Sequence, residues 1–200
     1  MSLKISYNAP VVLTFSIICA AVFFIPFTTT NQVASGPFAH LFILESSNDY
    51  TSMLLYIFGH ADVNHLLGNL SFILLLGPII EEKYGSTNLL IMIGITAIAT
   101  GILNVFFFNT GLLGASGIVF LFIMLASFGN AQKGIPLTFI LIAILFLGKE
   151  VWQAFQDNNI SEFAHIAGGI CGGLFGFSGF IKSRITPTPT TRNDEFDLYS

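Results

Sequence analysis

GASGIVFLFIMLASF, residues 114–128, joins a group of small residues to a short apolar run. About 13 to 15 mainly apolar residues follow Ser116 before Gly129, and as a helix rising ~1.5 Å per residue they reach only roughly 20 Å. A hydrocarbon core is roughly 30 Å thick, so this helix cannot cross it. The pattern predicts a membrane helix that begins at Ser116, below the outer surface, after glycines (Gly111, Gly114) that let the backbone dip inward.

The composition of the whole chain agrees with a membrane protein. Of its 200 residues, 54% are hydrophobic and only 9% are charged, and the mean hydropathy is +0.79. Soluble domains carry about a quarter charged residues. We therefore expect an all-α, polytopic membrane protein with six transmembrane helices at residues 10–27, 62–80, 88–108, 116–128, 135–155 and 162–181.

The alternative for the first run is a secretory signal peptide after Lys4. Its apolar core is long for that purpose, and no convincing small-residue cleavage site follows. Turn-forming residues separate the runs, among them residues 28–30 and 81–86. No internal repeat is found.

Cationic residues predict the orientation, because Lys and Arg near span ends stay on the cytoplasmic side. With six spans, six of the seven cations fall on the side of the two termini, and only Lys149 falls on the other. With five or seven spans, the cations would not fall on one side in this way. The expected domains are a cytoplasmic N-terminus at 1–9, a membrane domain at 10–181 and a solvated cytoplasmic tail at 182–200. Within the membrane domain, the outer connection at about 28–61 is so apolar that we expect it to be partly embedded.

Polar side chains at membrane depth are functional candidates, because burying them in lipid is costly. His65 and Asn69 are four residues apart, so they share one helix face and offer two neutral donors. His60 points elsewhere or precedes the helix. The alternative for His65 and Asn69 is a hydrogen-bonding role between helices. The acids all lie at span ends or in loops.

A stripe of glycines marks the last run. Counting from His165, glycines follow at +3, +4, +7, +8 and +11, the spacing of one helix face. Such stripes let a second helix approach closely, and Gly117 and Ala126 would suit that contact in the fourth run. If these helices pack together, His165 approaches Ser116. This would give a Ser-His dyad, with His165 as general base and the oxyanion stabilised by the Ser116 amide, His65 and Asn69.

The chain at this point resembles the rhomboid intramembrane serine proteases. Three motifs carry the likeness, in the family's order: His60-x4-His65-x3-Asn69, Gly114-x-Ser116-Gly117 and Ala164-His165-x2-Gly168-x3-Gly172. Glu81 ahead of Gly85-Ser86 is a further similarity. Two departures concern substrate handling. Phe120 stands where members often have Tyr, and the first outer connection lacks their Trp-Arg pair.

The resemblance implies a serine endopeptidase with Ser116 as nucleophile, His165 as general base, and His65 with Asn69 in the oxyanion hole. His60, Gly114, Gly117, Phe120, Gly168 and Gly172 would support this site. It also implies transmembrane helices as substrates, cut near the outer face, with the fifth span and its following loop as gate and cap. We expect an integral protein of the lipid bilayer, in a bacterial-type inner (plasma) membrane, without a cofactor.

Four other functions fit the sequence less well. An inactive rhomboid-like escort of transmembrane helices would need neither Ser116 nor His165, and both are present. A transporter would show paired broken helices, which are absent from the sequence. A metal site is disfavoured because His60 and His65 do not share a helix face. Nucleic-acid binding is excluded, since seven Lys and Arg residues and a net charge of −4 leave no basic surface.

Overall fold

The computed structural model describes residues 6–30, 44, 51–107, 111–127, 135, 137–148 and 162–178. All regular elements in this part of the chain are helical, and its single β-bridge pairs Leu44 with Leu112. The elements are α1 (Pro10–Thr30), α3 (Ser52–Leu55), the 3-10 helix η2 (Tyr56–Phe58), α4 (Val63–Tyr84), α5 (Ser86–Phe107), α6 (Ser116–Ser127), α7 (Leu137–Ile142), the π-helix η4 (Ala143–Leu147) and α9 (Glu162–Ser178).

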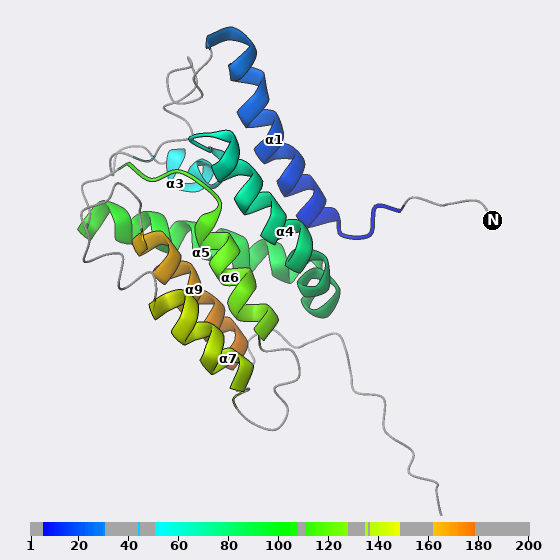
Figure 1. Ribbon diagram of the computed structural model, residues 1–200, viewed down its shortest axis with the longest axis vertical. Helices are drawn as coiled ribbons and strands as arrows, with labels where there is room; N and C mark the ends of the chain where they lie inside the picture. Colours follow the sequence, from blue (N-terminus) through cyan, green and yellow to red (C-terminus); the bar gives the residue numbers. More distant parts are fainter. Residues whose placement is uncertain are drawn as a thin grey trace, which may run out of the picture.

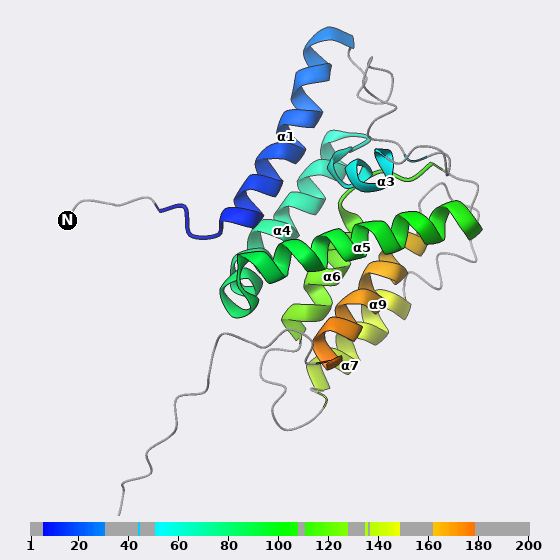
Figure 2. The same ribbon diagram turned by 180° about the vertical axis from the view of Figure 1, so that it is seen from behind.

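Helix α6 lies at the centre of the bundle. It runs beside α4 and α9, while α5 crosses behind it at a steep angle (Figures 1 and 2). Every residue from Gly117 to Leu125 is buried. A helix that is apolar all round is stable when other helices surround it. The expected short fourth helix is therefore present, and it ends at Ser127 after 12 residues.

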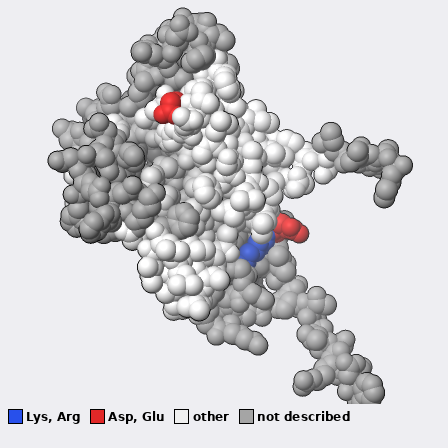
Figure 3. Space-filling model, in the orientation of Figure 1, with Lys and Arg blue, Asp and Glu red and all other residues white. Residues whose placement is uncertain are grey.

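Two of the described helices, α4 and α5, are long and apolar enough to cross a membrane. Shorter apolar helical stretches lie at Pro10–Phe24, Ser116–Ser127 and Phe163–Phe177. Among the described residues on the face in Figure 3, charged side chains stand out at only a few separate places. The all-helical class is thus confirmed, and the count of six spans stays a prediction.

Several predicted boundaries were wrong. Residues 28–30 continue α1 instead of forming a turn. Helix α4 continues through Glu81 to Tyr84, beyond the predicted end at Ile80. The predicted break at 81–86 shrinks to Gly85, whose φ of 84° reverses the chain where other residues would be strained. The fifth run begins its helix at Leu137, two residues late, and its last part, residues 149–155, lies outside the described residues.

The described part of the first outer connection packs against protein. Leu44, Ser52 and His60 are fully buried, and α3 and η2 lie against α5 and α1. Whether this connection also lies in the membrane interface stays a prediction, as do the expected domain limits.

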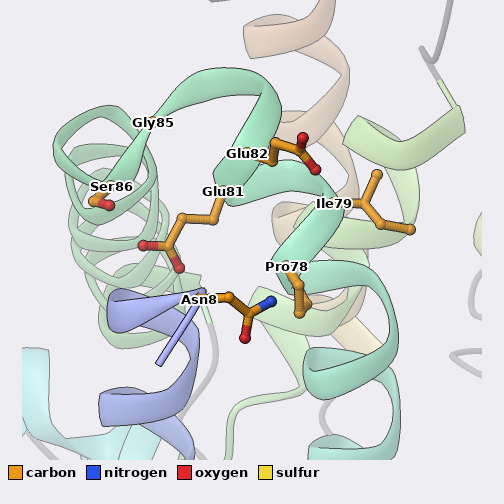
Figure 4. Close-up of a pocket in the computed structure, with 7 residues that line it drawn as sticks. All are labelled: Asn8, Pro78, Ile79, Glu81, Glu82, Gly85 and Ser86. Atoms are coloured by element: carbon orange, nitrogen blue, oxygen red, sulfur yellow. The ribbon is translucent and has the colours of Figure 1, made fainter. Parts of the chain in front are cut away.

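The carboxylate of Glu81 holds the start of α1. Its Oε1 accepts from the Val11 amide and its Oε2 from the Val12 amide, each at 3.0 Å, and the side chain is only 4% exposed. First-turn amides have no partner within their own helix, and an anion complements the helix dipole there. Figure 4 shows Glu81 beside the start of α1, at a cavity of about 550 Å³ that Asn8, Pro78 and Glu82 also line.

We expect Glu81→Gln to lower the free energy of unfolding by about 1 to 3 kcal/mol, because one charge-assisted bond is lost and an amide N–H meets a backbone N–H. Unfolding in mixed micelles measures this effect. Glu82→Gln is the control, since Glu82 is exposed and its replacement should change stability by less than about 0.5 kcal/mol. Equal effects of the two substitutions would contradict the prediction.

Candidate active site

Ser116 begins α6, as the sequence predicted. The Ala115 carbonyl accepts from the amides of Ile118 and Val119, at 2.9 and 3.0 Å, so helical hydrogen bonding starts there. The amides of Ser116 and Gly117 stand in the first turn, where no intrahelical acceptor exists. An anion forming next to Ser116 would therefore meet the positive end of the helix dipole.

The backbone before Ser116 is fastened to the first outer connection. Leu112 exchanges two hydrogen bonds of 3.0 Å with Leu44, and the Gly114 amide donates to the Tyr56 carbonyl at 2.9 Å. Gly114 has φ of 116°, a conformation that side-chain-bearing residues rarely adopt. The backbone segment that leads to Ser116 is therefore a turn held in one conformation.

Helix α9 packs on α6 through part of the glycine stripe. A Cβ at Gly168 would collide with the carbonyl oxygen and Cα of Gly117, so the two backbones touch. At Gly172 it would lie 2.8 Å from the Leu121 carbonyl oxygen. A Cβ at Gly173 would face α7 instead, 3.9 Å from the Phe139 ring. The expected contact with Gly117 is present, whereas the second contact involves Leu121 and Met124 and not the anticipated Ala126.

This packing brings His165 alongside the first turn of α6. His165 lies one turn before Gly168, and its imidazole stacks on the ring of Phe120, with centroids 4.6 Å apart and planes at 6°. Phe120 lies four residues after Ser116, so both share one face of α6. The imidazole and the serine therefore belong to the same corner of the bundle, and both side chains are half-buried.

His65 and Asn69 face the turn before Ser116 from the other side. A Cβ at Gly114 would lie 2.8 Å from Nε2 of His65 and 3.8 Å from Nδ2 of Asn69. Asn69 is 6% exposed, and its Nδ2 has no hydrogen-bond partner among the described residues. Side-chain nitrogens of both residues thus lie beside the backbone that leads to Ser116.

His60 lies before the start of α4, which is one of the two positions expected from the sequence. Asp62 caps the N-terminus of α4, because its side chain accepts a hydrogen bond from the His65 amide at 2.9 Å. The rings of His60 and His65 are in contact, edge against face, with centroids 5.1 Å apart. Helical spacing could not reveal this contact, because the chain between the two residues is only partly helical.

Burial lowers the pKa of His60 from its ordinary value of 6.5 to about 4, and the neighbouring His65 adds to this, while the Phe58 carbonyl and Asp62 act in the opposite direction. Between these pH values His60 binds a proton in the unfolded chain but not in the folded chain. We therefore expect the free energy of unfolding to fall by up to about 3 kcal/mol as pH drops from 6.5 to 4. Unfolding measured across this range, with His60→Phe as control, checks the prediction; equal pH slopes would contradict it.

Within the described residues, no three His, Cys, Asp or Glu side chains form a group that could hold a metal ion. Sequence patterns cannot reveal the contributions of Tyr56 and Leu44, because these residues act through backbone atoms that every residue type possesses.

The rhomboid-domain family model matches residues 47–182 of the chain. The match contains every residue of the corner formed by α4, α6 and α9, and α1 lies before it. No curated protein matches the chain.

Proposed function

The chain belongs to the rhomboid family, and from this premise we propose that it is a serine endopeptidase that cleaves transmembrane helices within the bilayer. Ser116 is the nucleophile and His165 the general base. The observation that carries the proposal is the stacking of His165 on Phe120, one turn along α6 from Ser116. A serine hydroxyl attacks only when a base takes its proton, and His165 is the base beside this turn.

The reaction runs through an acyl-enzyme. His165 takes the proton of the Ser116 hydroxyl as the oxygen bonds to the substrate carbonyl carbon. The resulting oxyanion receives hydrogen bonds from the Ser116 amide and from the side chains of His65 and Asn69. The carbon–nitrogen bond then breaks, and the leaving amine takes the proton from His165. Water, activated by His165, hydrolyses the ester and frees Ser116.

The membrane arrangement belongs to the same proposal. The rhomboid domain and the apolar helices indicate a membrane protein. We place six spans across a bacterial-type inner membrane, with both termini in the cytoplasm and Ser116 below the outer surface. The shortness of α6, at 12 residues, supports this depth, because a helix of ~18 Å cannot reach both surfaces.

Labelling with a fluorophosphonate probe tests the chemistry in detergent. We expect wild-type protein to be labelled, and Ser116→Ala and His165→Ala to lose the signal. Ser127→Ala is the control, because this serine lies at the other end of α6 and its hydroxyl donates to the Met124 carbonyl. Labelling that persists in Ser116→Ala, or is absent from the wild type, would favour an inactive protein that binds transmembrane helices.

A further inference from the structure

His60 is held firmly next to the proposed active site without belonging to it. Its Nδ1 lies 3.2 Å from the Phe58 carbonyl oxygen, and the residue is fully buried. A carbonyl oxygen only accepts, so Nδ1 carries the proton of the neutral ring. The ring is thus anchored to the end of η2, just before α4 begins.

The His65 imidazole lies between two walls. One is the His60 ring, with centroids 5.1 Å apart and planes at 63°. The other is the backbone of Gly114, close to the Nε2 edge of His65. The two walls are joined, because the Tyr56 carbonyl accepts from the Gly114 amide at 2.9 Å. The segment from Tyr56 to His60 therefore fixes both sides of the cradle around His65.

The ring of His65 needs this support. No hydrogen bond to either of its ring nitrogens is found among the described residues, and its side chain is only half-buried. A donor in an oxyanion hole must be held in place before the reaction, since a displacement of about 1 Å can cost roughly 10²-fold in rate. Packing against His60 and Gly114 is what restricts this imidazole.

We propose that His60 is a positioning residue, whose anchored ring holds the His65 imidazole so that its Nε2–H faces the oxyanion formed at Ser116. This inference rests on the proposed protease function.

The nitrogen of His60 matters as well as the ring. Its Nε2 is buried and has no hydrogen-bond partner among the described residues, which costs about 1 to 3 kcal/mol. Phenylalanine would fill the same space without that cost, but it cannot donate to the Phe58 carbonyl. The anchor therefore explains a histidine at this position, and His60→Phe separates ring packing from anchoring.

A double-mutant cycle between His60 and His65 tests the inference. Steady-state cleavage of a reconstituted transmembrane substrate gives kcat and KM for wild type, His60→Ala, His65→Ala and the double variant. We expect His60→Ala to lower kcat about 10- to 100-fold with KM unchanged, and to have no further effect once His65 is alanine. The loss of kcat should be smaller in His60→Phe than in His60→Ala. Val63→Ala, an exposed position on the first turn of α4, is the control.

A loss of the same size in both backgrounds would overturn the inference, since His60 would then act independently of His65. Unchanged kcat in His60→Ala would overturn it too. If thermal unfolding shows that His60→Ala is not folded, the same cycle is made with His60→Phe. A smaller loss of kcat that vanishes in the His65→Ala background is then expected, and an equal loss in both backgrounds overturns the inference. A wild type that neither cleaves nor reacts with the probe refutes the protease function itself, whereas an active wild type without coupling refutes only the role of His60.

Discussion

Ser116→Ala and His165→Ala should each slow cleavage of a transmembrane substrate by at least about 10⁴-fold, and the double variant should be no slower than either. In the proposed dyad the two residues would act as one unit, because the base has no proton to take without the hydroxyl and the hydroxyl does not attack without the base. Losses in such units are strongly non-additive. Single-turnover cleavage in proteoliposomes, with the products identified by mass spectrometry, measures all three variants.

The contacts of His165 and Gly168 with α6 make this prediction specific. His165 stacks on Phe120, and Gly168 touches Gly117, so two independent contacts set the imidazole against the turn that begins at Ser116. Ser127→Ala in the same helix should cleave at the wild-type rate. Multiplicative losses in the double variant would mean that the two residues do not share a step, and would remove the dyad from the mechanism.

Gly168→Ala should be strongly destabilising, because the new Cβ would come closer to backbone atoms than a Cβ at Gly172 or Gly173 would. The new Cβ would collide with the Gly117 backbone, which cannot move aside as the end of a side chain can. Overpacking of this kind costs typically 1 to 3 kcal/mol and occasionally more, and here it also pushes His165 away from α6. We expect about 3 kcal/mol less stability and at least a 100-fold loss of cleavage.

Gly173→Ala offers a matched control with the opposite sign. It makes the same change five residues later, where the nearest atom is 3.9 Å away on the Phe139 ring. Replacing an unconstrained helical glycine by alanine favours the helix by roughly 0.5 to 1 kcal/mol. Unfolding in mixed micelles and cleavage rates compare the two variants. Similar stabilities for Gly168→Ala and Gly173→Ala would mean that α6 and α9 do not touch through their backbones.

The sequence was most informative where a local pattern has a single physical solution. The short apolar run after Gly114 required a helix starting at Ser116, and α6 begins there. The glycine spacing after His165 required a close helix contact, and Gly168 makes it with Gly117. Both patterns describe constraints within about four helical turns, so one segment contained all the necessary information.

Contacts between distant segments remained outside the reach of such patterns. Glu81 was expected as a charge at the end of a span, yet it is buried beneath the start of α1, some 70 residues away in sequence. The Tyr56 carbonyl that holds Gly114 has no residue-specific signal at all. The glycines of α9 were expected on one face, but the packing divides them between α6 and α7, because a helix with three neighbours has no single contact face.

The burial of α6 from Gly117 to Leu125 separates the middle of this helix from the surroundings of the bundle. Its neighbours here are protein side chains of constant composition, so the local dielectric environment is insulated from changes in the acyl chains of the host membrane. Variation in lipid thickness or fluidity reaches this buried stretch as a mechanical displacement passed on by the helices around it.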